Sequence, residues 1–571
     1  MNNLLRVSKT IILISFVLFG CAGKKPGAPS KTPPEAPQTP PIYQDTSDFE
    51  KPPCSTPEIK IRQGSVCGNL VGTSNGKAVN AYLGIPFAET TGGRNRWKAP
   101  VPKAAWDGAL RATRLGPACP QDTTVMYPQS EECLSVNVWT PGEVSPFPRA
   151  VMVFIYGGAF IYGYNADPLY DGAYTAAYGD VVVVSMNYRL GALGFLSGIK
   201  DRKTGEEIKG NFGVLDQILA LEWVRDNVGA FGGDPDKVTI YGESAGAMSV
   251  GLHLLSSPRS EPLFRAGIME SNPLGLPYKN LKQSRSIAGK FASNLGCPVD
   301  DVGCMRAALL EVVLDAQQQK DFIWPALFHG IRDMLVWAPV IDGEVLIEQP
   351  IEAAASGRLT KPVIIGTNAN EALIFVELTK TALGWKTVSD FDYRLTMDFI
   401  FRDRGLREKI YDKYPPDGKD NTGLISNVLT DYLFTCPSLD AASHASREAW
   451  SYIFDHVPSF NVWPGVPACA EAVCHAAELS FVFHTPEGRR GKFTPQENAL
   501  SNLMVGYWAD FAKNLNPDGG ANAWSEFNPA SLNLVFVTPV KDIQAKPDTT
   551  SDCAFWDGVG YNLRDSFWGL F

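Results

Sequence analysis

Residues 238–255 read Val-Thr-Ile-Tyr-Gly-Glu-Ser-Ala-Gly-Ala-Met-Ser-Val-Gly-Leu-His-Leu-Leu, and this stretch decides the fold. Its first four residues, 238–241, are mostly β-branched or aromatic and predict a buried strand. The pentapeptide Gly242-Glu243-Ser244-Ala245-Gly246 matches G-x-S-x-G, and residues 247–255 favour a helix. Strand, turn and helix in this order lift the serine hydroxyl above a sheet edge, with a helix N-terminus facing it. We therefore predict that Ser244 is a nucleophile.

Other short runs repeat the strand pattern, at residues 150–156, 181–184, 362–365 and 452–454. They are almost continuously apolar, which is typical of strands covered on both faces. Between them lie longer amphipathic segments, such as 216–227, in which Ile218, Leu221 and Val224 fall near one face of a helix. This alternation predicts an α/β fold, with a large, mostly parallel central sheet and helices on both faces.

Composition excludes several classes of protein. The 571 residues are 45% apolar and 20% charged, which is typical of a globular chain. Lys and Arg number 51 against 61 Asp and Glu, and the net charge of −10 argues against binding to nucleic acid. The sequence contains no CxxC pair and no HExxH motif, so it gives no support for a zinc site. Residues 58–571 show neither repeat nor linker, so we expect one catalytic domain there.

The N-terminus resembles a bacterial lipoprotein signal. Residues 1–20 combine two basic side chains with an apolar stretch that is too short to cross a bilayer as a helix. Residues 18–21, Leu-Phe-Gly-Cys, resemble a lipobox, in which Cys21 is lipidated and becomes the first residue of the mature chain. Ordinary signal cleavage nearby is the alternative. We expect an exported protein of the bacterial envelope, anchored by lipid to the outer membrane or cell surface.

A proline-rich segment follows at 21–57, with ten prolines after Cys21. Such a composition favours extended polyproline II conformations and cannot bury a core. We interpret it as a tether between the membrane and the folded domain; a tail without a role has the same composition. An exported chain meets an oxidising environment, so the other ten cysteines can pair, although spacing alone does not decide the connectivity.

The chain resembles the type-B carboxylesterases, the lipase and cholinesterase branch of the α/β-hydrolase fold. Matching stretches are spread between residues 68 and 568 and include 81–88 (Ala-Tyr-Leu-Gly-Ile-Pro-Phe-Ala), 137–141 (Asn-Val-Trp-Thr-Pro), 187–191 (Asn-Tyr-Arg-Leu-Gly) and 231–235 (Phe-Gly-Gly-Asp-Pro). The resemblance covers nearly all of the folded part and implies an α/β-hydrolase domain with helical insertions over the active site.

The same resemblance implies a Ser-His-Glu triad. Of six histidines, His475 lies in a segment similar to the family's catalytic histidine, and Glu371 lies in one similar to its triad acid. Ala476 and Ala372 stand where the family often has glycine. His475 would take the proton of Ser244, and Glu371 would orient the ring.

An oxyanion hole is implied by residues 156–160, Tyr-Gly-Gly-Ala-Phe. The backbone N–H groups of Gly158, Ala159 and Ala245 would face the developing negative charge. Two supporting groups follow from the same resemblance, a buried acid near the histidine and a serine beside the triad acid: Glu243 and Ser271.

The resemblance also pairs six cysteines, as Cys119–Cys133, Cys297–Cys304 and Cys436–Cys553. Four cysteines then remain. We expect them to pair as Cys469–Cys474, beside His475, and as Cys54–Cys67, at the start of the domain; the second pair follows by elimination only. A short bridge at Cys469–Cys474 would stiffen the loop that carries His475.

These features predict a carboxylesterase that acts on a small-molecule ester through an acyl-enzyme and needs no metal or organic cofactor. The segment between Cys119 and Cys133 contains no tryptophan, so choline esters are not expected as substrates. A lipase acting on longer-chain esters is one alternative. A non-catalytic binding protein of the same fold is another, but such proteins lack part of the triad. The sequence does not define an oligomeric state.

Overall fold

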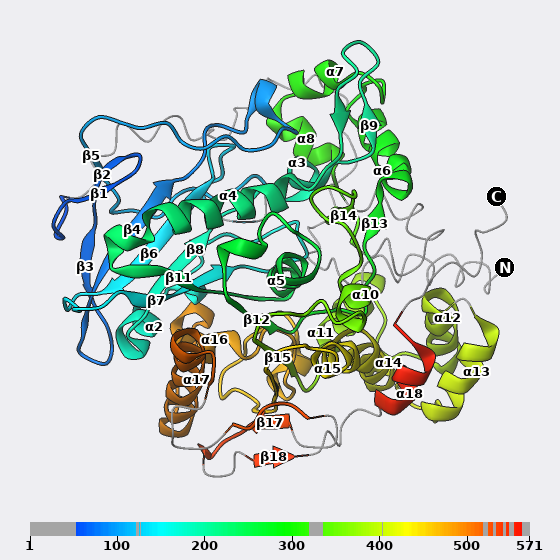
Figure 1. The fold of residues 1–571 in the computed structure, drawn as a ribbon. Coiled ribbons are helices and arrows are strands. Elements are labelled where there is room, and N and C mark those ends of the chain that lie inside the picture. The colour runs from blue at the N-terminus through cyan, green and yellow to red at the C-terminus, as the bar shows by residue number, and fades with distance from the viewer. Residues whose placement is uncertain are drawn as a thin grey trace, which may run out of the picture.

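An eleven-stranded sheet is the centre of the computed structural model, which describes residues 53–121, 125, 127–318, 335–401, 403–517, 524–528, 533–540, 544–546 and 553–561 (Figure 1). Seven neighbouring strands are parallel: β8 (Val182–Met186), β7 (Arg149–Ile155), β11 (Gly233–Glu243), β12 (Ala266–Glu270), β15 (Val363–Asn368), β16 (Ala449–Phe454) and β17 (Asn533–Phe536). Antiparallel strands complete both edges: β6 (Ser135–Pro141), β4 (Ala78–Pro86) and β3 (Asn69–Gly72) beside β8, and β18 (Gln544–Lys546) beside β17. The predicted mostly parallel sheet is confirmed.

The strands predicted from apolar runs are all present, as β7, β8, β11, β15 and β16. Residues 151–155 of β7 are fully buried, as expected for a strand covered on both faces. Of the N-terminal predictions, the signal at 1–20, the lipidated Cys21 and all but the end of the tether at 21–57 lie outside the described residues.

Helices cover both faces of the sheet (Figure 1). One face carries α4 (Phe212–Asn227), α5 (Ala245–Leu255), α10 (Pro350–Ala355) and α15 (Cys436–Ser443), and the other carries α2 (Ala173–Gly179), α16 (Leu479–Val482) and α17 (Pro495–Asn514). A capping box of Thr494 and Glu497, with proline in the first turn, starts α17. A Cβ atom on Gly179 would come within 2.6 Å of the Ala509 Cβ, so glycine lets α2 and α17 pack closely.

Two groups of helices are inserted between strands of the sheet and lie beside it in Figure 1. The first follows β12: α6 (Leu281–Asn294), α7 (Val302–Ala307) and α8 (Leu310–Ala316). The second follows β15: α11 (Leu373–Leu383), α12 (Asp390–Ile400), α13 (Arg404–Lys413), α14 (Thr422–Leu429) and a π-helical turn at Thr430–Thr435. Shorter elements are β1 (Ile59–Ile61), β2 (Gly64–Cys67), β5 (Ala109–Arg111), α3 (Gly191–Phe195), β9 (Ile199–Lys200), β10 (Glu207–Ile208), β13 (Lys279–Asn280), β14 (Val340–Ile341) and α18 (Cys553–Val559).

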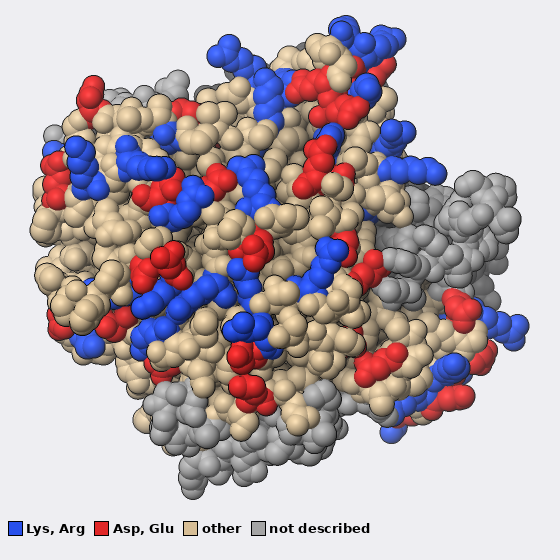
Figure 2. All heavy atoms as spheres, viewed as in Figure 1, with Lys and Arg blue, Asp and Glu red and all other residues tan. Residues whose placement is uncertain are grey.

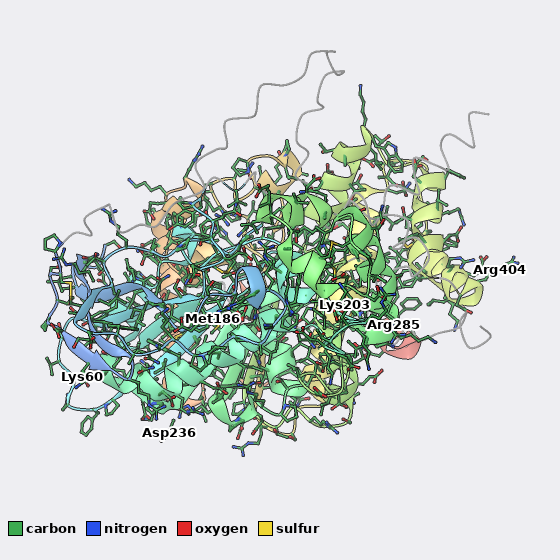
Figure 3. All side chains as sticks on the ribbon, turned by 90° about the horizontal axis from the view of Figure 1, so that it is seen from above. Lys60, Met186, Lys203, Asp236, Arg285 and Arg404 are labelled. Atoms are coloured by element: carbon green, nitrogen blue, oxygen red, sulfur yellow. A yellow bond between two sulfur atoms is a disulfide. The ribbon has the colours of Figure 1, made fainter. Side chains whose placement is uncertain are left out.

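Buried apolar side chains form one large cluster that spans both layers of helices and the sheet. Met186 of β8 lies inside it, whereas the labelled charged residues Lys60 and Arg404 lie at the periphery (Figure 3). A second, small cluster surrounds Cys469 and Cys474.

All five predicted disulfides are present: Cys54–Cys67, Cys119–Cys133, Cys297–Cys304, Cys436–Cys553 and Cys469–Cys474. Cys436–Cys553 has the widest sequence separation, 117 residues, and fastens α18 to α15. The pair at Cys54–Cys67, which rested on elimination, is confirmed.

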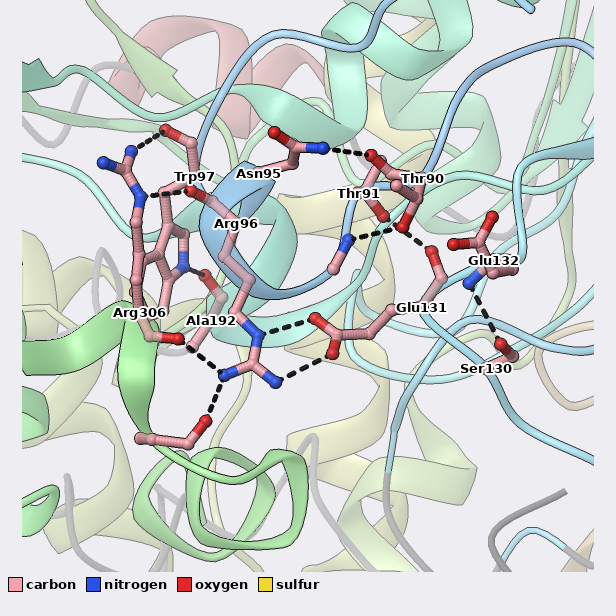
Figure 4. A network of polar contacts seen from close by, with 12 residues as sticks. Thr90, Thr91, Asn95, Arg96, Trp97, Ser130, Glu131, Glu132, Ala192 and Arg306 are labelled. Carbon is pink, nitrogen blue, oxygen red and sulfur yellow. Dashed lines mark hydrogen bonds and ion pairs between the residues drawn. The ribbon is translucent and has the colours of Figure 1, made fainter. Parts of the chain in front are cut away.

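A polar network joins the Cys119–Cys133 segment to the first helical insertion (Figure 4). The buried Arg96 guanidinium binds both carboxylate oxygens of Glu131, at 2.7 and 2.8 Å. It also donates to the backbone carbonyl of Ala308, and Arg306 in α7 donates to the carbonyl of Arg96 at 2.9 Å. Bidentate pairing fixes the orientation of both partners, so this network holds the insertion against the core.

On the face shown in Figure 2, acidic and basic side chains are interspersed. Several charged side chains of the described residues form ion pairs, such as Arg259 with Glu222 at 2.9 Å. Within the described ranges, no helix is both long and apolar enough to cross a membrane.

A buried ion pair supports the loop that follows β8. Arg189 binds both oxygens of Asp216 in α4, at 2.8 and 2.7 Å, and its backbone N–H donates to the same carboxylate at 3.0 Å. Both side chains are almost completely buried. Gly191, which opens α3 at the end of this loop, donates its N–H to the carbonyl of Phe160, so the pair also supports the 156–160 segment.

We predict that Asp216→Asn lowers the free energy of unfolding by about 3–5 kcal/mol, because it leaves the buried guanidinium without its counter-charge. The matched control is Glu207→Gln, which removes the exposed partner of Lys200 and should change the free energy of unfolding far less, because solvent screens an exposed ion pair. Urea unfolding followed by tryptophan fluorescence measures both. Equal shifts of the two midpoints would contradict the role assigned to the buried pair.

Candidate active site

The parallel strands bring the predicted site residues to one edge of the sheet. Strands β7, β11, β12, β15 and β16 are consecutive neighbours. The candidate residues follow their carboxyl ends in the same order: Gly158 and Ala159, Ser244, Ser271, Glu371 and His475. Sites of open α/β sheets form at this edge, where the loops after successive strands meet.

Ser244 occupies a strained turn between β11 and α5. Its φ of 56° and ψ of −123° lie outside the regions that side-chain-bearing residues usually adopt. A Cβ atom on Gly246 would lie 1.9 Å from the carbonyl oxygen of Ile155, and one on Gly242 would lie 2.5 Å from it. Both glycines of the motif are therefore sterically required. The backbone N–H of Ser244 donates to the Glu270 carbonyl at 3.0 Å and anchors the turn on β12.

His475 is oriented by Glu371. The ring Nδ1 lies 2.6 Å from Glu371 Oε2, and Glu371 Oε1 accepts the backbone N–H of Asn368 at 2.7 Å. Glu371 is fully buried, and the rings of Phe375 and Phe434 lie 5.2 and 5.4 Å from the imidazole. A neutral ring that donates from Nδ1 to the carboxylate keeps its lone pair on Nε2. That nitrogen can then accept a proton.

The second ring nitrogen lies 3.0 Å from Glu243 Oε1 but makes no hydrogen bond within the described part of the chain. The expected hydrogen bond from Ser244 to Nε2 is therefore not formed in this state. Catalytic hydrogen bonds of this kind often tighten only when substrate is bound.

Carboxyl groups dominate the electrostatics around the imidazole. Burial lowers the pKa of His475, but the neighbouring Glu243 and Glu371 carboxylates outweigh it, and the pKa is raised above its ordinary value. Burial also raises the pKa of Glu243, and the positive form of His475 opposes this effect. Burial together with the nearby Glu371 raises the pKa of Glu478. The neighbouring carboxylates thus stabilise the charged imidazolium.

Glu478 is a buried acid whose position was not predicted. Its Oε2 accepts the Asn368 side-chain amide at 2.5 Å, and its Oε1 accepts the Ser271 hydroxyl at 3.3 Å. The same amide also donates to Ser271 Oγ at 3.2 Å. Ser271 therefore makes no hydrogen bond to Glu371 in the described structure and reaches it through Asn368. A charged residue three positions after His475, before the apolar run at 479–483, was the available signal for Glu478.

The predicted oxyanion loop adopts a conformation with three successive positive φ angles, 108° at Gly158, 53° at Ala159 and 60° at Phe160. A Cβ atom on Gly157 would lie 2.6 Å from the Glu243 carbonyl oxygen, so the loop presses against the nucleophile turn. Neither Gly158 nor Ala159 donates its N–H to an acceptor among the described residues. Ala245 opens α5, where the N–H has no acceptor within the helix.

The two alanines that replace frequent glycines behave differently. Ala476 has a φ of 66°, in the left-handed region where glycine is favoured. Ala372 has a φ of −82°, which any residue adopts without strain. The glycine conformation is thus retained beside the histidine and is not needed beside the acid.

The other described histidines have structural partners. His253 contacts Ser260 and Gln217, and His456 contacts Glu497 and Thr538. His484 stacks on Tyr174, and His444 lies at the surface against the Asp440 carbonyl. His329 lies outside the described residues.

No group of three or more His, Cys, Asp or Glu side chains that could hold a metal ion occurs in the described ranges.

A serine on a strained strand–helix turn at the carboxyl edge of this sheet places the chain among the α/β-hydrolases. The sequence model of the carboxylesterase family matches residues 55–556. A para-nitrobenzyl esterase of Bacillus subtilis is 34% identical over 514 residues, covering 86% of this chain and 96% of the relative. An acetylcholinesterase of Bungarus fasciatus is 32% identical, covering 88% of this chain and 86% of the relative.

Solved structures of esterases also resemble this chain. A thermophilic PNB esterase superposes with a TM-score of 0.72 at 32% identity, covering 86% of this chain and 98% of its own. A further PNB esterase gives a TM-score of 0.69 at 34% identity, covering 86% of this chain and 98% of its own. The chain belongs to the carboxylesterase family and is a carboxylic ester hydrolase.

We predict that Glu243→Gln moves the acidic limb of the pH profile of kcat/KM to lower pH, by about one unit. His475 must be neutral to accept a proton, and its raised pKa places the wild-type limb above the ordinary histidine value. Removing the charge 3.0 Å from Nε2 lowers that pKa.

Glu270→Gln is the matched control. Glu270 is equally buried, but its side chain binds the Trp508 indole instead, and burial raises its pKa well above the ordinary value. Because Glu270 is held by Trp508 and does not contact His475, the control should leave the acidic limb in place. If the acidic limb of kcat/KM in Glu243→Gln lay at the wild-type pH or above it, the effect assigned to the Glu243 carboxylate on the pKa of His475 would be wrong.

Proposed function

We propose that this protein hydrolyses small carboxylic esters through an acyl-enzyme on Ser244. His475 Nε2 takes the proton from Ser244 Oγ while Oγ bonds to the ester carbonyl carbon. The N–H groups of Gly158, Ala159 and Ala245 stabilise the negative oxygen of the tetrahedral intermediate. The intermediate collapses, and the alcohol leaves with the proton from His475. Water then gives a proton to His475 and attacks the acyl carbon, which releases the acid and returns the proton to Ser244.

The hydrogen bond of 2.6 Å between His475 Nδ1 and Glu371 carries this proposal. It favours the tautomer with a free lone pair on Nε2, and it stabilises the positive charge that forms when Ser244 is deprotonated. The strained turn at Ser244 and the N–H groups of Gly158 and Ala159, which have no acceptor among the described residues, support the same chemistry.

Uncharged aryl or alkyl esters are the proposed substrates. Two apolar aromatic side chains lie beside His475, those of Phe375 and Phe434. They suit an uncharged ester. The segment between Cys119 and Cys133 has no tryptophan to bind a quaternary ammonium. The similarity to para-nitrobenzyl esterases points in the same direction.

Kinetics on p-nitrophenyl and p-nitrobenzyl esters test the proposed triad. We expect Ser244→Ala and His475→Ala each to lower kcat by about 10⁴-fold or more, and Glu371→Gln by about 10²- to 10⁴-fold. Ser145→Ala, in the loop that precedes β7 at the opposite edge of the sheet, is the control and should keep wild-type kcat. Undiminished hydrolysis by Ser244→Ala would refute the assigned nucleophile.

The same assay separates the alternatives. Activity confined to long-chain esters at an oil–water interface would favour a lipase. Folded wild-type protein that hydrolyses no ester of the panel would favour a binding protein.

We propose further that the mature chain is held at the bacterial envelope by lipid on Cys21, because residues 18–21 resemble a lipobox and a proline-rich segment follows. We expect wild-type protein expressed with its signal to partition into the detergent phase of Triton X-114, and Cys21→Ser to move to the aqueous phase. Ser30→Ala, in the same tether, should partition like the wild type. Detergent partitioning of Cys21→Ser would contradict lipidation at this position.

A further inference from the structure

The segment that carries His475 has little regular structure to hold it. Between the end of β16 at Phe454 and the start of α16 at Leu479, the only described helix is the short turn Pro467–Ala470. His475 nevertheless needs a fixed position, because its ring must meet Glu371 on one side and Ser244 on the other. Contacts other than those of helices and strands must supply this order.

A disulfide lies directly before the histidine. Cys474 is bonded to Cys469, only 5 residues earlier, and both are almost completely buried. The bridge closes a tight loop whose last residue adjoins His475. On the other side, the Trp463 indole donates to the His475 carbonyl at 2.7 Å.

Asn370 connects this loop to the acid. Its backbone N–H donates to the Val473 carbonyl at 3.0 Å, and its side-chain oxygen accepts the Val473 N–H at 3.1 Å. Both backbone polar groups of Val473 are therefore bound by the residue that precedes Glu371. The pairing continues as an isolated parallel bridge between Asn370 and Cys474.

A separate apolar cluster encloses the bridge. Its buried members are Ile374, Val466, Cys469 and Cys474, and side chains of α11 and Trp463 pack against it. Because α11 begins two residues after Glu371, the cluster joins the helix that follows the acid to the loop that precedes the base. This cluster is distinct from the main core.

We propose that the Cys469–Cys474 bridge and Asn370 form one positioning device, which holds His475 in register with Glu371 for the reaction at Ser244. The inference rests on the proposed function and extends it. Neither the disulfide nor Asn370 touches the reacting atoms; both act through the backbone on either side of the His475–Glu371 hydrogen bond.

The test compares two double variants of the full-length oxidised protein on a soluble p-nitrophenyl ester. Removing the bridge, as Cys469→Ala with Cys474→Ala, should lower kcat by about 10- to 100-fold, because small misplacements of catalytic groups are costly. KM should change little. The acidic limb of the kcat/KM profile should move to lower pH, because a loosened His475 loses the influence of the carboxylates.

The matched control removes Cys297–Cys304, a bridge of 7-residue separation that joins α7 to the residues before it in the other insertion. It should leave kcat and the pH limb unchanged, with circular dichroism showing both proteins folded. If the variant Cys469→Ala, Cys474→Ala kept the wild-type kcat and the wild-type pH of the acidic limb, the inference would be overturned. An equal loss of kcat in both double variants would also overturn it. A wild-type protein with no esterase activity would instead overturn the proposed function beneath it.

Asn370→Ala provides a second test that leaves every disulfide intact. It removes the acceptor of the Val473 N–H and should also lower kcat with little change in KM, whereas Asn370→Asp keeps an oxygen there and should retain more of the wild-type kcat. If the two parts act as one device, adding Asn370→Ala to the bridge-free variant should lower kcat by less than the product of the separate effects. Wild-type kcat in Asn370→Ala would overturn the role of Asn370.

Discussion

The parallel register of β7, β11, β12, β15 and β16 is the constraint on which the site depends. Parallel neighbours end at the same edge, so the loops that follow them meet although they are far apart in sequence. Glu371 and His475 are separated by 104 residues and lie in direct contact there. A change of order among these strands would separate Ser244, Glu371 and His475.

Close approach of backbone to backbone is the second requirement. A Cβ atom on Gly157 would collide with residues 243–244, and one on Gly242 or Gly246 would collide with Ile155 at the end of β7. Their absence of side chains lets the oxyanion loop lie directly against the nucleophile turn. The strain at Ser244, Ala159 and Phe160 persists because fully buried strands and helices surround these turns. The stability of the core therefore maintains a geometry that the local sequence alone would not adopt.

The sequence predicts those parts of the structure that depend on local chemistry. Apolar runs define the parallel strands, and the glycines around Ser244 define the turn, because both depend on neighbouring residues. The pairing of His475 with Glu371 required a family resemblance, since no local pattern links positions so far apart. Glu478 was missed, and the contacts of Ser271 differ from those implied, because both depend on the Asn368 side chain. The role of Asn370 was likewise out of reach, since an asparagine in a turn reveals nothing about a loop a hundred residues later.

Covalent labelling tests the central claim most directly. The oxidised mature protein would be treated with a fluorophosphonate, and the modified peptide mapped by mass spectrometry. We expect one label per chain, on Ser244, and its loss in His475→Ala, because only a serine activated by that base reacts readily. A folded protein that takes up no label, or takes it up at another residue, would contradict the account.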